Sequence, residues 1–341
     1  MNSKKLVYDT LNFKSPERAP RQLWCLDYAR IYHSEELSKI LTDYPEDIIQ
    51  IQARLKTPLA KVSGVQTQKG VYTDEWGSVF INISEGYNGE VKEPLILDDE
   101  WRDADKVHIP EELLSFDIDE VNGRIATEYA DKFILSGCCP RPFEQLQFIR
   151  GTENLYIDLM MRPKGMFEFM EKMHDFYMRL LEKWCLTDID AIYFMDDWGS
   201  QNSLLISPEL FNELFMPMYK DYIALAKEYN KKTFMHTDGN TLAIIPKLID
   251  AGLDALNSQL FCIGLDNLKD FRGNITFWGE IDRQHLLPYG SVSDIKEAVR
   301  QVYGALWANG GCIAQCEFGP GARPENVRAV YSGWDEVTMK S

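Results

Sequence analysis

The strongest constraint on the fold is a regular alternation of short apolar runs with longer amphipathic runs, which begins near residue 130. The short runs have the length of strands, and the longer runs repeat apolar residues at helical spacing. Six strand–helix units follow one another, with predicted strands at 133–137, 190–197, 233–238, 254–259, 275–282 and 312–318. Strands that alternate with helices in this way indicate a parallel sheet.

The N-terminal third adds two candidate strands, RQLWC at 21–25 and DIIQIQ at 47–52. Eight such units in 341 residues fit a single (β/α)8 TIM barrel better than a doubly wound sheet. No GxGxxG or GxxxxGK[ST] pattern supports a nucleotide-binding fold. The alternating segment GVYTDEWGSVFINIS predicts a β-hairpin over 70–84, inserted near the barrel mouth. We therefore predict one domain over residues 1–341, with an N-terminal extension.

Helix boundaries are also indicated locally. A long helical tract is expected from about 153 to 185, and a final helix from Pro324. The helix in TLAIIPKLIDAG should end at Gly252, because glycine favours the position after a helix. Ser293 is the expected N-cap of the helix in SDIKEAVRQVYGALWANG.

Composition excludes several classes of function. A net charge of −17 would repel a phosphate backbone, so nucleic-acid binding is not expected. No apolar run approaches the roughly 20 residues that span a bilayer. The seven cysteines are scattered and odd in number, which favours reduced thiols. With a polar amino terminus, these features predict a soluble cytoplasmic globular protein.

Chemistry is concentrated in the stretch FMHTDGN, residues 234–240, at the end of one predicted strand. His236 and Asp238 are two residues apart, so in a strand their side chains point to the same face. The carboxyl ends of barrel strands form the face where active sites lie. From these residues alone, the pair could hold a metal, bind a substrate or bind only each other.

Other polar residues follow the neighbouring strands, and these are Asp196, Asp197, Asn257, Gln259, Glu280, Asp282, Cys316 and Glu317. An imidazole, a thiolate and several carboxylates form a set that zinc accepts. We predict His236 and Cys316 as ligands. Asp238 or Glu280 would be the third ligand or a carboxylate that orients the imidazole. The Asp196–Asp197 pair could instead cap the helix that follows.

Several segments resemble the uroporphyrinogen decarboxylase superfamily. FMDDWGSQNSLLISPELFNELFMPMYK and KKTFMHTDGNTLAIIPKLIDAGLDALNSQ are similar to two of its motifs. ITFWGEIDRQHLLPYGS and GGCIAQCEFGPGARPENVRAV are similar to its last two strand–helix units. The resemblance covers most of residues 130–335 and implies a (β/α)8 barrel.

The superfamily contains porphyrinogen decarboxylases and cobamide-dependent methyltransferases. The decarboxylases share an arginine-rich W-x-x-R-Q-x-x-R segment that holds propionate groups. Here that stretch begins at Trp24, and Asp27 stands where the first arginine belongs. A carboxylate there would repel a polyanionic tetrapyrrole. The resemblance is therefore closer to the methyltransferase branch.

The methyltransferases share an H-x-C pair on the fifth strand and a cysteine before the last helix. His236 and Cys316 fall on two of these positions, and Asp238 replaces the middle cysteine. The resemblance implies a zinc-dependent methyltransferase that acts on a small methyl donor or acceptor, with a corrinoid carried by a partner protein. The alternative is a decarboxylase-like lyase acting on a carboxylated small molecule.

Within that interpretation, Asp197, Gln259 and Glu280 are the predicted catalytic residues, as orienting or acid–base groups. Four aromatic residues are candidates to line the small-molecule pocket: Trp76, Trp198, Phe261 and Trp278.

Overall fold

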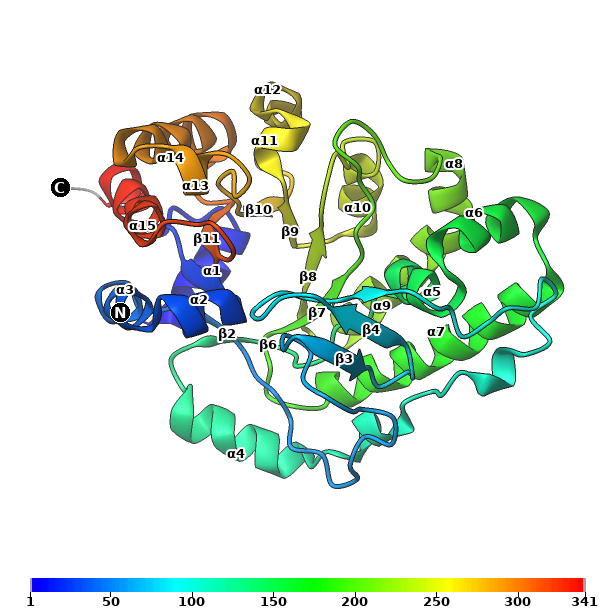
Figure 1. The fold of residues 1–341 in the computed structure, drawn as a ribbon. Helices are drawn as coiled ribbons and strands as arrows, with labels where there is room; N and C mark the ends of the chain where they lie inside the picture. The colour runs from blue at the N-terminus through cyan, green and yellow to red at the C-terminus, as the bar shows by residue number, and fades with distance from the viewer. Residues whose placement is uncertain (1, 340–341) are drawn as a thin grey trace.

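The computed structural model describes residues 2–339, and its main feature is a sheet of eight parallel strands (Figure 1). The strands lie in the order β1-β11-β10-β9-β8-β7-β6-β2. Between the two end strands, the Asp47 amide donates to the Arg21 carbonyl at 2.8 Å, so the sheet nearly closes. The bounds are β1 (Arg21–Cys25), β2 (Ile48–Gln50), β6 (Phe133–Leu135), β7 (Ala191–Met195), β8 (Lys232–Thr237), β9 (Ala255–Ser258), β10 (Thr276–Trp278) and β11 (Cys312–Phe318). The predicted TIM barrel is confirmed.

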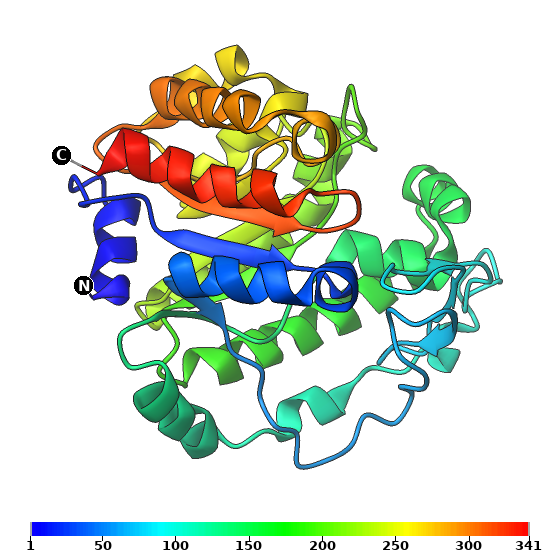
Figure 2. The same cartoon turned by 60° about the vertical axis from the view of Figure 1, so that its left-hand side comes forward.

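Helices surround this barrel, and Figure 2 shows α14 and α15 (orange and red) side by side on its outside. The α-helices are α1 (Ser3–Leu11), α2 (Asp27–Tyr32), α3 (Ser34–Asp43), α4 (Ile118–Glu128), α5 (Pro142–Arg150), α6 (Thr152–Met161), α7 (Lys164–Cys185), α8 (Pro208–Leu210), α9 (Met216–Glu228), α10 (Ile245–Ala251), α11 (Leu260–Ile263), α12 (Leu265–Leu268), α13 (Leu286–Tyr289), α14 (Val292–Leu306) and α15 (Pro324–Thr338). Short 3-10 turns lie at Ala104–Lys106, Glu111–Ser115 and Lys269–Phe271, and a π-helical segment, Phe211–Phe215, connects α8 to α9. Of the helices in residues 2–339, none is long and apolar enough to cross a membrane.

The barrel strands bury both of their faces, as parallel strands between helices must. One face points into the barrel, where Phe133, Tyr193, Phe234, Trp278 and Ile313 form a buried cluster. The other face packs against the helices in a larger cluster. Since side chains alternate along a strand, a residue's parity, meaning its odd or even position along the strand, decides whether its side chain points into or out of the barrel.

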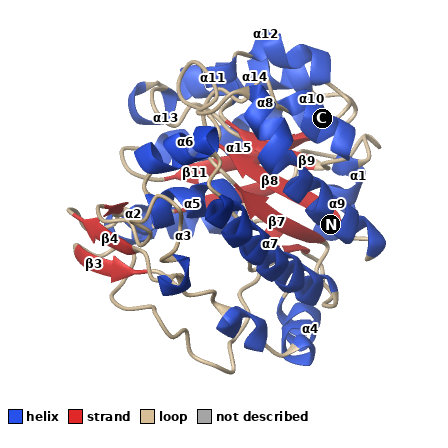
Figure 3. Cartoon of the chain, turned by 90° about the vertical axis from the view of Figure 1, so that its right-hand side faces the viewer, coloured by secondary structure: helices blue, strands red, loops and turns tan. Residues whose placement is uncertain are grey.

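The predicted hairpin is present and gains a third strand. β3 (Gly70–Thr73) pairs antiparallel with β4 (Val79–Asn82), which pairs with β5 (Glu90–Val91). Figure 3 shows this sheet apart from the barrel strands and near α2. Thr67, just before β3, donates to the Asp27 carboxylate at 2.5 Å. The small sheet is thereby tied to the helix that follows β1 at the barrel mouth.

Two of the predicted helix boundaries are confirmed and two are corrected; α15 begins at Pro324, as predicted. Gly252 ends α10 with φ 93°, as expected. The tract 153–185 is two helices, because Arg162 has φ 59° and Pro163 follows it. The N-cap of α14 is Ser291 rather than Ser293: its hydroxyl accepts from the Asp294 amide at 3.2 Å, and the Asp294 carboxylate accepts from the Ser291 amide at 2.8 Å.

Candidate metal centre

A cluster of one imidazole and two carboxylates lies at the carboxyl ends of β7 and β8. His236 Nε2 is 3.4 Å from Asp197 Oδ1 and 3.7 Å from Asp238 Oδ1. Each residue offers one ligand atom, and these atoms lie within 4.8 Å of one another. The sequence spacing therefore correctly placed His236 and Asp238 together. Asp197, predicted only as a catalytic group, joins them.

The two loops that carry the aspartates touch through glycines. Gly199 donates its amide to the Asp238 carbonyl at 2.9 Å. A Cβ on Gly239 would lie 2.1 Å from the Gly199 carbonyl oxygen, and Gly239 also has φ 78°. Only glycine permits this approach, which explains the glycine that follows Asp238. The Asp238 amide then donates to Asp197 Oδ1 at 3.2 Å, which fixes one carboxylate relative to the other.

Asn257 on β9 sets the orientation of the histidine. Its amide nitrogen donates to the Trp278 carbonyl, so its oxygen faces His236 Nδ1 at 2.6 Å. An oxygen partner requires the proton on Nδ1, which leaves Nε2 as the nitrogen aimed at the two aspartates. The edge of Trp24 packs on the imidazole at 5.0 Å between ring centroids. The imidazole is thus held in an orientation in which Nε2 could bind a metal ion.

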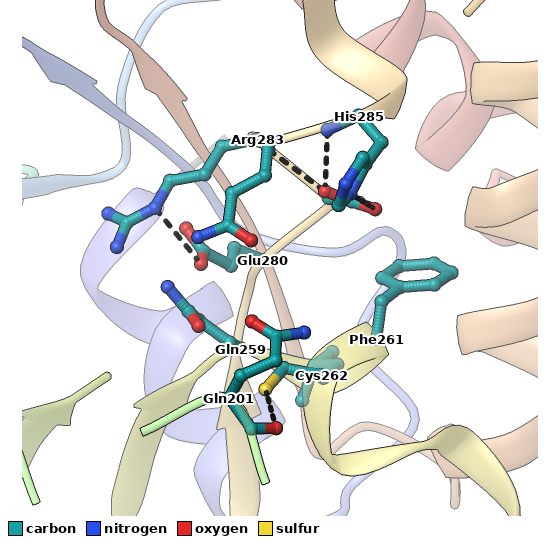
Figure 4. Close-up of a pocket in the computed structure, with 10 residues that line it drawn as sticks. Gln201, Gln259, Phe261, Cys262, Glu280, Arg283 and His285 are labelled. Atoms are coloured by element: carbon teal, nitrogen blue, oxygen red, sulfur yellow. Dashed lines mark hydrogen bonds and ion pairs between the residues drawn. The ribbon is translucent and has the colours of Figure 1, made fainter. Parts of the chain in front are cut away.

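Arg283, which no sequence pattern indicated as a site residue, binds the Asp238 carboxylate through its other oxygen. Its guanidinium donates to Asp238 Oδ2 and, at 2.9 Å, to Glu317. It also lies 3.6 Å from Glu280 (Figure 4). Asp238 Oδ1 is left buried with no hydrogen-bond partner among residues 2–339. A buried carboxylate oxygen without a partner is costly, so this atom is suited to receive a cation.

The charges of the cluster shift the pKa values of His236 and Asp197. Burial alone would lower the pKa of His236, but the Asp197 hydrogen bond and the Asp238 charge raise it to about 9. Burial raises the pKa of Asp197, and the hydrogen bond and charge of His236 outweigh this and lower it. Without a metal, the site at neutral pH therefore holds an imidazolium between carboxylates. A metal ion would replace that proton.

A cavity of about 160 Å3 lies next to Arg283 and Glu280 (Figure 4). It is lined by Gln201, Gln259, Leu260, Phe261, Cys262, Glu280, Asp282, Arg283, Gln284 and His285. Gln259 Oε1 accepts from the Gly239 amide at 3.2 Å, which leaves its amide nitrogen for a ligand. Burial raises the pKa of Glu280 to about 8, against the opposing charge of Arg283. Two of the predicted catalytic residues, Gln259 and Glu280, therefore line this cavity together with Arg283, which contacts Asp238.

Cys316 lies away from this cluster, which corrects its prediction as a metal ligand. On β11, Ile313 points into the barrel, and Cys316 has the opposite parity. Its side chain belongs to the buried cluster between strands and helices. Burial raises the pKa of the thiol well above its usual value, as for an inert core cysteine. The next residue, Glu317, has the inward parity and contacts Arg283.

Asp196 has a structural role that the sequence left open. It is fully buried and accepts from the Phe143 amide at 3.1 Å, the Glu144 amide at 2.7 Å and the Tyr219 hydroxyl at 2.5 Å. It therefore caps α5, which precedes it in the chain, rather than the helix that follows.

The four aromatic candidates divide into two groups. Phe261 lines the cavity in Figure 4, and Trp76 lines a second, larger cavity. Trp198 and Trp278 are fully buried core residues, at 0% and 1% exposure. Trp198 stacks on Phe143 at 4.2 Å between ring centroids.

The methyltransferase from Methanosarcina mazei is a solved structure with the same fold. The TM-score is 0.68 at 13% identity, over 98% of this chain and 99% of that chain. Two sugar epimerases align less well: 3-keto-D-glucoside 4-epimerase from E. coli (TM-score 0.42, 10% identity, 72% of this chain and 97% of that one) and D-psicose 3-epimerase (0.41, 12%, 67% and 87%).

No curated protein matches the sequence. The family model for uroporphyrinogen decarboxylase (URO-D) matches residues 79–336, which is well over half of the chain. This match agrees with the barrel and with the resemblance seen in the sequence. The chain belongs to the uroporphyrinogen decarboxylase family.

Proposed function

We propose that this protein is a methyltransferase that uses a zinc ion and moves a methyl group between a small molecule and a corrinoid carried by a partner protein. The observation that carries the proposal is the Asp197–His236–Asp238 cluster, in which His236 Nε2 lies near Asp238 Oδ1, a buried oxygen that accepts no hydrogen bond within residues 2–339. Three protein ligands leave a fourth position of a tetrahedral zinc free, as in catalytic sites.

The residues fit zinc in donor type as well as in number. One imidazole nitrogen and two carboxylate oxygens form a harder set than the thiolate-containing set predicted from the sequence. Bound there, zinc would polarise the heteroatom that carries or receives the methyl group. Asn257 would fix the imidazole, and Arg283 would fix the Asp238 carboxylate.

Two cavity residues would handle the substrate itself. Because the pKa of Glu280 is raised to about 8, its carboxyl group keeps a proton near neutral pH. Glu280 would deliver that proton to a departing oxygen or nitrogen as a general acid. Gln259 would donate a hydrogen bond from the amide nitrogen left free by its contact with Gly239.

Methyl transfer is favoured over decarboxylation by the environment of Asp27. Its carboxylate is engaged by Thr67 at 2.5 Å and lies 3.5 Å from Arg30. A carboxylate in this place offers no binding site for propionate groups. The likeness in fold to a methyltransferase supports the same choice. The corrinoid partner is inferred from the family resemblance.

The test combines metal content with turnover. Protein reconstituted with zinc under reducing conditions should hold one equivalent of metal, which His236→Gln should lose and Asp197→Asn should bind more weakly. Wild-type protein should then methylate free cob(I)alamin from a panel of methyl ethers and methylamines, as seen in the visible spectrum.

His174→Gln is the matched control, because His174 also pairs with an aspartate, Asp221, at 3.0 Å but on the surface. It should keep both metal and activity. Failure of wild-type protein to bind any metal would refute the proposal. Release of carbon dioxide from a carboxylated substrate by chelator-treated protein would favour the alternative, a decarboxylase-like lyase.

A further inference from the structure

A second and larger cavity, of about 520 Å3, lies at the carboxyl ends of β2, β6 and β7. Its residues are Gln50, Gln52, Ala53, Leu55, Leu59, Gln66, Glu75, Trp76, Leu113, Phe116, Gly137, Cys138, Cys139, Pro140, Arg141, Tyr177, Leu180, Trp184, Tyr193 and Met195. Several come from the irregular segment 52–66, which covers one side. The volume is within the range of small-molecule sites, roughly 300–1,000 Å3.

Aromatic side chains form part of the wall of this cavity. Five of its aromatic side chains are at most 8% exposed, and these are Trp76, Phe116, Tyr177, Trp184 and Tyr193. Phe116 and Trp184 pack together at 4.7 Å, and Trp76 and Tyr177 at 5.7 Å, between ring centroids. Aromatic faces and edges of this kind favour a flat, apolar ligand.

Arg141 is the only cationic side chain among the residues that line the cavity. It directly precedes α5, and its guanidinium lies over the Phe148 ring at 5.3 Å. Among residues 2–339, its one side-chain hydrogen bond is a long one, from Nη1 to Glu144 at 3.4 Å. Most of its five donors are therefore unused. A guanidinium with free donors beside aromatic side chains is suited to a carboxylate, which it can bind through two parallel hydrogen bonds.

The same wall limits the number of negative charges on the ligand. Glu75 is the only carboxylate among the lining residues, and Glu144 already takes part of the Arg141 charge. A second acidic group on the ligand would meet no cation and would be repelled by Glu75. One carboxylate is therefore accommodated, whereas a polyanionic tetrapyrrole is not.

The cavity adjoins the metal cluster. Met195, at the end of β7, lines the cavity and pairs in register with His236 on β8. Neighbouring strands are about 4.8 Å apart. A ligand anchored at Arg141 can therefore extend its other end towards the cluster.

We propose that this cavity binds the small-molecule substrate, an aromatic compound with a single carboxylate that pairs with Arg141. The identification of this compound as a methyl donor rests on the proposed function, but its binding does not. Binding of the acid needs neither zinc nor a corrinoid, so the two ideas can be tested separately.

The test is calorimetric binding to full-length, chelator-treated protein, with 4-methoxybenzoate and its neutral analogue 4-methoxybenzamide as probes. A charge-assisted pair predicts that wild-type protein binds the acid about tenfold to hundredfold more tightly than the amide. Arg141→Gln should abolish that preference. Arg162→Gln, at an exposed ion pair with Glu213, should retain it.

Location in the cavity is tested by Leu55→Trp, which would fill it and weaken binding of both probes. Equal binding of acid and amide to wild-type protein would overturn the proposal, whatever the fate of the variants. So would the absence of binding for both probes, or an unchanged preference in Arg141→Gln. An Arg141-dependent preference in a protein that binds no metal would retain this inference and refute the proposed function.

Discussion

Metal affinity should increase with pH well into the alkaline range. The reason is that His236 Nε2 is a proposed metal ligand and must first lose a proton, and the pKa of His236 is raised. Metal can bind only after Nε2 has lost its proton. An ordinary histidine is largely deprotonated at neutral pH, but the pKa of His236 is raised to about 9 by Asp197 and Asp238, despite its burial. Between pH 6.5 and 8.5, we therefore expect affinity to rise about tenfold per pH unit.

The size of the effect follows from the two pKa values. At pH 6.5, protonation of a histidine with a pKa of about 9 weakens metal binding about 300-fold relative to the fully deprotonated side chain. Protonation of an ordinary histidine weakens it about twofold. The same shift affects the stability of the metal-free protein. Since the folded pKa is above the unfolded one, the stabilisation is complete below pH 6.5. About 3 kcal/mol of it is lost as the pH rises to about 9.

The assay is competition for cobalt or zinc with a chromophoric chelator at several pH values, corrected for protonation of the chelator. Asp197→Asn should lower overall affinity and also flatten the pH dependence, because it removes the hydrogen bond that raises the histidine pKa. Asp221→Asn, at the surface pair with His174, should change neither quantity.

A flat affinity between pH 7 and 8.5 in wild-type protein would refute this reasoning. It would mean either that His236 is not a ligand or that the two aspartates do not stabilise its protonated form. If metal affinity has the same pH dependence in wild type and Asp197→Asn, only the role of the Asp197–His236 hydrogen bond is refuted.

Four further predictions concern single residues. Arg283→Gln should weaken metal binding about tenfold to hundredfold, because the carboxylate it orients becomes free to rotate; unchanged affinity in the chelator assay would contradict this. Cys316→Ala should keep full metal content and lose about 1 kcal/mol of stability in urea denaturation, since it lies in the core; loss of metal would restore it as a ligand. Glu280→Gln should stabilise the protein at pH 8.5 but not at pH 5. The folded pKa of about 8 exceeds the unfolded value, so ionisation costs stability as the pH rises, and an equal effect at both pH values would exclude this. Asp196→Ala should cost about 3 kcal/mol or more in urea denaturation, because it leaves three buried donors unpaired, and a near-neutral effect would rule out the capping role.

The barrel could be predicted from the sequence because the patterns that indicate its strands and helices are local and are repeated along the chain. Each strand shows as a short apolar run and each helix as a 3.6-residue period, so that errors at single boundaries do not change the number of units. The break between α6 and α7 shows the limit of this reasoning. The apolar periodicity runs through 153–185, whereas the left-handed conformation of Arg162 before Pro163 ends the helix.

Part of the site was determined in the same local way. The i, i+2 spacing in FMHTDGN places His236 and Asp238 on one face, and the following glycine permits the close approach of a neighbouring loop. Asp197 follows a strand at the barrel mouth, and the sequence shows this much. That it lies beside His236 follows only from the lateral register of β7 and β8.

The tertiary structure alone decided which of the remaining groups face the cluster. Cys316 and Glu317 are adjacent in sequence, yet only Glu317 has the inward parity, and a shift of one residue would exchange them. Arg283 contacts carboxylates from three different strand ends, so no sequence spacing reveals its partners. The sequence by itself determined the repeating strand–helix units and the pairing of His236 with Asp238 on one strand face. The closure and register of the barrel determined the ligand set, because they bring together side chains far apart in the chain.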